Sequence, residues 1–134
     1  AHRSQLVTEV SGVVFINDSK ATNVDSAVKA LETFAKIRWI CGGEQKEEDI
    51  SRLNNVLANV EKAYVIGTNA AKFSSQISCE FEICNTMDVA VNKAFNDAKD
   101  GETVLLAPAA ASFDQYSSFE ERGKAFEQEI EKLV

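Results

Sequence analysis

The sequence predicts an α/β fold with a mostly parallel sheet, and three observations support this prediction. Short apolar runs alternate with segments whose apolar residues recur at helical spacing, an order typical of parallel strands joined by helices. The runs at 37–41 and 103–107 are apolar almost throughout, as buried parallel strands are. The opening runs, 6–10 and 13–16, are separated by Ser11-Gly12 alone, which predicts a tight antiparallel hairpin. We therefore expect a Rossmann-like domain of three layers, with a six-stranded sheet, one antiparallel edge strand and about five helices.

The elements after the hairpin follow from local patterns. Along the chain we expect a helix at 24–35, a strand at 37–41, a helix at 50–57, a strand at 63–66, a short helix at 70–77, a strand at 81–84, a helix at 87–98, a strand at 103–107 and a helix at 119–133. The helix at 87–98 has the clearest apolar stripe and is closed by Gly101. Ser118 and Glu121 fit a capping box at the start of the last helix.

Composition limits the classes of function. The 134 residues suffice for one domain, which could bury roughly 68% of its unfolded surface and needs no disulfide or metal for stability. The net charge of −7 opposes binding to nucleic acid or to an anionic membrane. The longest apolar runs, of about five to seven residues, are far shorter than a membrane span.

The cysteines and the single histidine exclude another class of site. Cys41, Cys79 and Cys84 contain no CxxC pair, and with one His in the chain a zinc site is not expected. We interpret the three as reduced core residues of a cytoplasmic protein. His2 begins an alternating segment rather than a signal peptide, and Ala1 without a preceding Met suggests a fragment or a processed chain.

Ligands of open parallel sheets bind beyond the carboxyl ends of the strands, which directs attention to the loops there. Three such loops, at 17–23, 42–46 and 108–115, are rich in polar or small residues. The loops at 67–69 and 85–86 are interpreted as ordinary turns that start helices.

Each of the three loops has a structural and a functional interpretation. The polar residues at 17–23 could be helix caps, but Lys20 is unfavourable near a helix N-terminus unless an anionic ligand binds there. Gly42-Gly43 could form a flexible turn or let the backbone approach a ligand. Lys46 could be a solvated charge, and the alanines at 109–111 could serve packing or leave room for a substrate that Ser112 contacts.

Common catalytic motifs are absent from the sequence. GxGxxG, GxxxxGKS/T, GxSxG and HExxH do not occur, and no catalytic dyad is apparent. Asp18, just after a strand, could suggest a phospho-acceptor domain, but the acidic cluster that would hold its metal is missing.

The three loops together resemble a known family. The string Asn-Asp-Ser-Lys-Ala-Thr-Asn at 17–23, with His2-Arg3 before it and Gly-Gly-x-x-Lys at 42–46 after it, resembles the C-terminal domain of the D-glutamate-adding ligases of the Mur ligase family. Pro-Ala-x-Ala-Ser-x-Asp-Gln at 108–115 and Phe-Glu-x-Arg-Gly at 119–123 extend the resemblance over essentially the whole chain. Glu44-Gln45 departs from the Asp-Gly turn expected of the family, and Phe113 stands where Leu is frequent.

The resemblance implies an activity and a set of site residues. Such ligases use ATP and Mg²⁺ to phosphorylate the carboxylate of UDP-N-acetylmuramoyl-L-alanine, and D-glutamate then attacks the acyl phosphate. By resemblance, Arg3 and Asp18 bind the nucleotide and Lys20 is catalytic beside the transferring phosphate. A further group binds D-glutamate: Thr22, Lys46, Ser112 and the backbone near Phe119.

The resemblance also implies that residues 1–134 are a single domain of a larger enzyme. The UDP-binding domain and the ATPase domain, with its P-loop and Mg²⁺ ligands, are absent from this sequence. We therefore expect an inactive monomer that binds no ligand tightly by itself and no metal. Two alternatives are a flavodoxin-like regulatory module that binds a phosphate or nucleotide, and the matching domain of a folylpolyglutamate-type ligase.

Overall fold

The computed structural model describes residues 4–134 and contains strands and helical segments in the order that the sequence predicts. In chain order they are β1 (Gln5–Val10), β2 (Val13–Asn17), α1 (Val24–Thr33), β3 (Ile37–Gly42), the 3₁₀ helix η1 (Ser51–Asn59), β4 (Val60–Ile66), α2 (Ala70–Ser74), β5 (Phe81–Asn85), α3 (Met87–Asp97), β6 (Thr103–Leu106) and α4 (Phe119–Glu131). None of the helices in this described part is long and apolar enough to cross a lipid bilayer.

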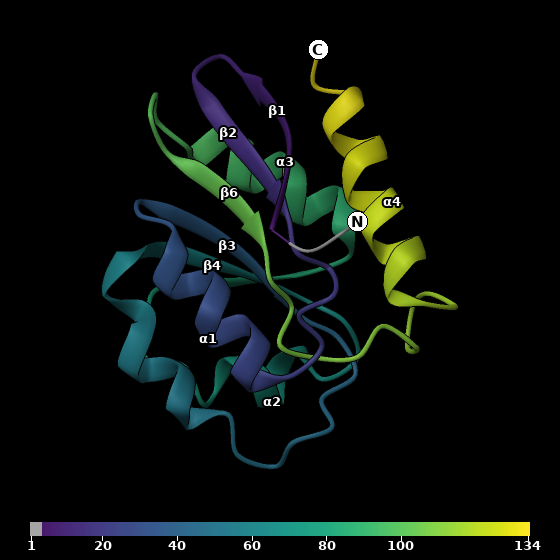
Figure 1. Cartoon of the computed structure of the whole chain (residues 1–134). Helices are drawn as coiled ribbons and strands as arrows, with labels where there is room; N and C mark the ends of the chain where they lie inside the picture. The colour runs from purple at the N-terminus through teal and green to yellow at the C-terminus, as the bar shows by residue number, and fades with distance from the viewer. Residues whose placement is uncertain (1–3) are drawn as a thin grey trace.

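The strands form one six-stranded sheet in the order β1-β2-β6-β3-β4-β5. β1 pairs antiparallel with β2 at one edge, and every other pairing is parallel, which confirms the predicted architecture. The last strand, β6, lies between β2 and β3 (Figure 1). The carboxyl ends of β2, β6 and β3 therefore lie side by side, and their loops meet at one edge of the sheet.

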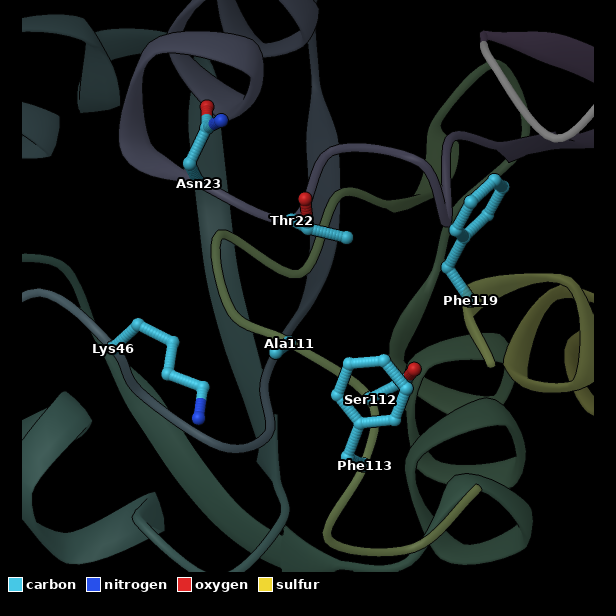
Figure 2. Close-up of a pocket in the computed structure, with 7 residues that line it drawn as sticks. All are labelled: Thr22, Asn23, Lys46, Ala111, Ser112, Phe113 and Phe119. Carbon is cyan, nitrogen blue, oxygen red and sulfur yellow. The ribbon is translucent and has the colours of Figure 1, made fainter. Parts of the chain in front are cut away.

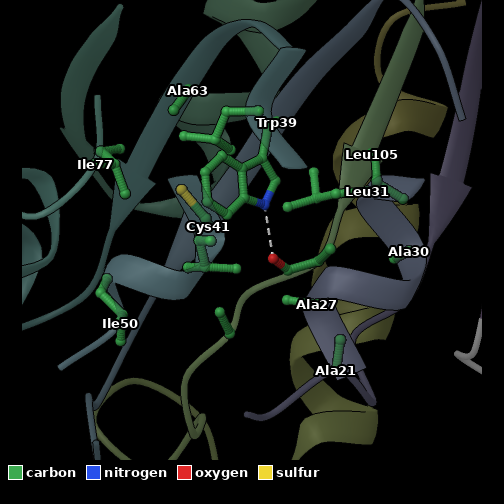
Figure 3. Close-up of a cluster of buried hydrophobic side chains, with 14 of the residues drawn as sticks. Ala21, Ala27, Ala30, Leu31, Trp39, Cys41, Ile50, Ala63, Ile77 and Leu105 are labelled. Atoms are coloured by element: carbon green, nitrogen blue, oxygen red, sulfur yellow. Dashed lines mark hydrogen bonds between the residues drawn. The ribbon is translucent and has the colours of Figure 1, made fainter. Parts of the chain in front are cut away.

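Helices cover both faces of the sheet and create two cores (Figure 1). One core packs α1, η1 and α2 against side chains such as Trp39, and the other packs α3 and α4 against Phe15 and Tyr64. Figure 3 shows the indole N–H of Trp39 donating to the carbonyl of Ala107 at 2.8 Å. Because Ala107 directly follows β6, this buried hydrogen bond fixes the start of the loop between β6 and α4 to the hydrophobic core.

Two helices differ from the helices that the sequence predicts. The segment predicted as a helix over 50–57 is a 3₁₀ helix with a kink at Val56. The Asn54 side chain there donates to the Gln76 carbonyl at 3.0 Å and accepts from the Ser78 N–H at 2.9 Å, so tertiary contacts compete with regular helix geometry. α2 ends at Ser74, whose hydroxyl bonds back to the Ala71 carbonyl.

A polar cluster lies near the amino ends of the strands, at the end of the sheet opposite the loops that follow β2, β3 and β6. Nε of Arg38 lies 2.9 Å from Oε1 of Glu102, and the Tyr64 hydroxyl donates to Asp97 at 2.8 Å. Burial by itself would raise the pKa of Glu102, but hydrogen bonds from Arg38 and from the Lys99 N–H outweigh burial and lower it. Burial likewise opposes the hydrogen bonds from Tyr64 and Lys62 that lower the pKa of Asp97.

The lowered pKa of Glu102 predicts how stability depends on pH. A carboxylate whose pKa is lower in the folded state stabilises the fold above its unfolded pKa of 4.5, and this contribution disappears as the pH falls through the folded pKa. We expect the free energy of unfolding in urea to decrease between pH 5 and about pH 3. Glu102→Gln should make this decrease less steep, and an identical pH dependence in the variant would contradict the assignment.

Candidate functional site

A pocket of about 430 Å³ lies where the loops after β2, β3 and β6 meet (Figure 2). The chain passes from β2 and β3 to helices on one face of the sheet, but from β6 to α4 on the other face (Figure 1). The loops therefore diverge and leave a crevice, the position where open α/β sheets bind ligands. The residues that line it are Thr22, Asn23, Lys46, Ala111, Ser112, Phe113 and Phe119.

The structure brings four of the predicted site residues together. All four line the pocket: Thr22, Lys46 and Ser112 from three loops distant in sequence, and Phe119 from the start of α4 (Figure 2). The other predicted residues lie elsewhere. Lys20 is exposed on the same loop as Thr22, and Asp18 is buried, with its Oδ2 accepting from the Ser4 hydroxyl at 3.2 Å. Arg3 lies outside the described residues.

Asn17 holds the loop at 17–23 against the last helix. Its Oδ1 accepts from the Ser19 N–H at 3.0 Å, and its Nδ2 donates to the Gly123 carbonyl at 3.3 Å and to Glu127 at 2.8 Å. At the far end of the loop, Asn23 caps α1 by accepting from the Ser26 N–H. The capping interpretation is thus confirmed for Asn23, while Asn17 acts between two distant segments.

Gly42 and Gly43 allow close approach of one backbone segment to another. Their φ angles are +98° and +145°, and a Cβ on Gly43 would lie 2.5 Å from the Ala111 carbonyl oxygen. Directly after them, Glu44 and Ala111 form an antiparallel bridge with N–H···O distances of 2.8 and 2.9 Å. The glycines therefore join the loop that carries Lys46 to the loop that carries Ser112.

Lys46 supplies the ammonium group of the pocket. Its side chain is 64% exposed, and Nζ lies 3.3 Å from Oε1 of Glu44. An exposed pair of this kind contributes little to stability and can be exchanged for another partner. The carboxylate of a ligand could therefore displace Glu44 as the partner of the Lys46 ammonium group.

The two loops interpreted as ordinary turns also contribute to the site. Oδ2 of Asp114 accepts from the Thr68 N–H at 2.9 Å, and the Gln115 side chain donates to the Asn85 carbonyl at 2.7 Å. Oδ1 of Asn69 accepts from the Gln45 N–H at 2.8 Å. The turns after β4 and β5 therefore support the loops that line the pocket, a role that the sequence analysis missed.

Arg122 is the residue beneath the pocket that the sequence analysis gave no role. Only 1% of it is exposed, and burial lowers its pKa to about 10, so it remains charged at neutral pH. A signal for it was present, because Arg122 stands on an apolar stripe of helical spacing with Phe119, Phe126 and Ile130. A cation on such a stripe is seldom buried without partners.

The donors of the pocket suit a small dicarboxylate. Lys46 offers a cation, and the hydroxyl of Ser112, a residue 2% exposed, has no hydrogen-bond partner among residues 4–134. Phe119 is the first residue of α4, where N–H groups lack partners within the helix and attract anions. The pocket therefore combines a cation with neutral donors and a helix N-terminus, and Phe113, 68% exposed, adds an apolar wall.

Comparisons with known proteins agree with this geometry. Residues 2–110 match the family described as "Mur ligase, glutamate ligase domain". The chain is 61% identical over 133 residues to the UDP-N-acetylmuramoylalanine–D-glutamate ligase of Ruegeria pomeroyi, and 58% identical over 133 residues to that of Roseobacter denitrificans. These alignments cover 99% of the chain but only 28% and 29% of the two relatives, so the chain spans less than a third of their length.

A solved structure shares the fold. It is a domain from a putative UDP-N-acetylmuramate:L-alanyl-γ-D-glutamyl-diaminopimelate ligase of Haemophilus ducreyi, with a TM-score of 0.64 and 10% sequence identity. The similarity covers 94% of this chain and 98% of that one, so the whole three-layer arrangement is common to both.

Proposed function

Since this chain belongs to the Mur ligase family, we propose that it is the C-terminal, amino-acid-binding domain of a ligase that adds D-glutamate to UDP-N-acetylmuramoyl-L-alanine in peptidoglycan synthesis. The observation that carries the proposal is the pocket itself, where Lys46, Thr22 and Ser112 meet beside the start of α4. Lys46 and Thr22 hold one carboxylate of D-glutamate. Ser112 and the N–H of Phe119 hold the other.

The proposed chemistry is amide formation through an acyl phosphate. ATP phosphorylates the substrate carboxylate, the amine of D-glutamate attacks the carbonyl carbon, and the resulting tetrahedral intermediate expels phosphate. This domain orients the amine by fixing both carboxylates, which converts an encounter of two molecules into a positioned reaction. Lys20 meets the charge that develops on the transferring phosphate.

The nucleotide is bound jointly with the rest of the enzyme. Asp18 accepts from the ribose hydroxyls, and Arg3 contacts the phosphates. Among residues 4–134, no three His, Cys, Asp or Glu side chains gather in a way that could hold a metal ion. We propose that UDP-binding and ATPase domains elsewhere in the protein supply the P-loop and the Mg²⁺ ligands.

The proposal extends to the setting of the enzyme. It is a cytoplasmic monomer, and its partners are D-glutamate, ATP and UDP-N-acetylmuramoyl-L-alanine. The relatives at 58–61% identity are named D-glutamate ligases, which favours this function over a regulatory module or a folylpolyglutamate-type ligase.

The test of this function uses the full-length protein and the isolated chain side by side. The full-length protein should release phosphate when given ATP, Mg²⁺, UDP-N-acetylmuramoyl-L-alanine and D-glutamate, and not when L-glutamate replaces D-glutamate. Residues 1–134 alone should release none and should bind D-glutamate and ADP weakly. Submicromolar nucleotide affinity of the isolated chain would instead support the regulatory module.

Lys46→Ala in the full-length enzyme should raise KM for D-glutamate roughly ten- to a hundredfold. The reason is the loss of one charge-assisted hydrogen bond, which contributes about 1.5–3 kcal/mol. Lys72→Ala, on α2 and outside the pocket, is the matched control and should leave KM unchanged. Steady-state kinetics decide, and an unchanged KM in Lys46→Ala would mean that Lys46 is only a solvated charge.

A further inference from the structure

Arg122 connects three segments that are distant in sequence. Its Nε donates to the Ser19 hydroxyl at 3.0 Å, its Nη2 to the Ser19 carbonyl at 2.7 Å, and its Nη1 to the Ala110 carbonyl at 2.9 Å. Ser19 belongs to the loop of Thr22, and Ala110 to the loop of Ser112. Arg122 itself lies in the first turns of α4.

The guanidinium also lies against the third loop. A Cβ placed on Gly43 would come within 3.4 Å of Nη1 of Arg122, so the turn after β3 packs directly beside the charged group. The Ser19 hydroxyl, which accepts from Arg122, donates in turn to the Phe119 carbonyl at 2.7 Å. One planar group thus fixes the loops after β2 and β6 to the start of α4, beside the loop after β3.

This arrangement is not one that stability alone would favour. A buried cation is costly, and one near a helix N-terminus opposes the helix dipole. The hydrogen-bond acceptors of Arg122 are a hydroxyl and two carbonyls, all neutral. Among residues 4–134 no carboxylate lies within ion-pairing distance of it, and the attraction of Asp114 from farther away does not offset the effect of burial, which lowers the pKa of Arg122. A lysine, with its single ammonium group, could not reproduce the planar arrangement of N–H donors that the guanidinium provides.

We propose that Arg122 is a positioning residue for D-glutamate, which sets the spacing between Thr22 and Ser112 on the two sides of the pocket. The inference rests on the proposed function. Arg122 does not line the pocket, so it acts through the loops it holds. Its buried positive charge additionally favours the approach of a dicarboxylate.

The test compares Arg122→Lys with Arg52→Lys in the full-length enzyme. Arg122→Lys keeps the charge but loses the planar set of guanidinium donors. KM for D-glutamate should therefore rise about tenfold or more. KM for UDP-N-acetylmuramoyl-L-alanine, which other domains hold, should stay within about twofold. Arg52, an exposed residue paired with Asp25, is the matched control, and its variant should change neither constant.

A second variant covers the case in which Arg122→Lys does not fold. Ser19→Ala removes only the hydroxyl between Arg122 and Phe119, and should raise KM for D-glutamate about threefold. In the double variant the two effects should be less than multiplicative, because both remove the same contact.

The outcomes separate the two proposals. Unchanged KM for D-glutamate in the folded variants, with only a lower melting temperature, would reduce Arg122 to a structural residue and overturn the inference alone. A wild-type enzyme that does not add D-glutamate would overturn the proposed function and this inference with it.

Discussion

Gly43→Ala should destabilise the fold and disrupt the pocket together. An alanine at φ +145° is strained, which costs about 1–3 kcal/mol. Its Cβ would also lie 2.5 Å from the Ala111 carbonyl oxygen, and relieving that overlap costs about another 1–3 kcal/mol. Both costs are large against a total stability of about 5–15 kcal/mol, and urea unfolding of the chain measures them.

The overlap should also have a kinetic consequence. To relieve it, the loops must separate at the Glu44–Ala111 bridge, which moves Lys46 away from Ser112. The full-length variant should therefore show a higher KM for D-glutamate than the wild type, even where it remains folded.

Gly101→Ala is the matched control for this substitution. Gly101 also has a positive φ, +89°, but nothing lies within 4 Å of an added Cβ. Its replacement should cost only the backbone strain, about 1–2 kcal/mol, and leave KM for D-glutamate unchanged. Equal stability of the Gly43 and Gly101 variants would contradict the close packing of the loops.

Lys20→Ala should lower kcat of the full-length enzyme about 10²–10³-fold, a loss typical of removing one group that stabilises developing charge. Among residues 4–134 Lys20 has no ion pair, and it is exposed beside the pocket rather than lining it. Its ammonium group is therefore available to the phosphate that the rest of the enzyme would present. KM for D-glutamate should change little, because in the proposed function Lys46 and Thr22, not Lys20, bind that substrate.

Two further variants serve as controls for this measurement. Lys20→Arg keeps the charge and should restore part of kcat, whereas Lys29→Ala, exposed on α1, should match the wild type. A kcat within threefold of the wild type in Lys20→Ala would remove Lys20 from the catalytic group.

Most of the fold could be predicted from the sequence, because periodicity is a local property of the chain. The apolar runs and the helical stripes located every strand and helix, and Ser11-Gly12 predicted the hairpin. The cap at Ser118 was predicted as well, because a capping box joins residues only three positions apart. In the structure the Ser118 hydroxyl accepts from the Glu121 N–H at 3.1 Å. The kink at Val56 was not, because Asn54 bonds to a segment that only the folded chain brings near.

The candidate site was also predicted only in part. The rule that ligands bind beyond parallel strands, with the polar loops, predicted which segments would meet. Four of the residues that the family resemblance implied line one pocket. The groups that hold those segments together were missed. Ser19 and Arg122 are separated by 103 positions, and no spacing pattern relates them.

By itself, the sequence determined the order and type of the elements and the loops at the ligand edge. The tertiary structure decided that β6 lies between β2 and β3, that Gly43 abuts Ala111 and that Arg122 is buried beneath the pocket. The physical reason is that helix and strand patterns depend on neighbours a few residues apart. Burial of a charge and contact between backbones depend instead on residues that come together only when the sheet has formed.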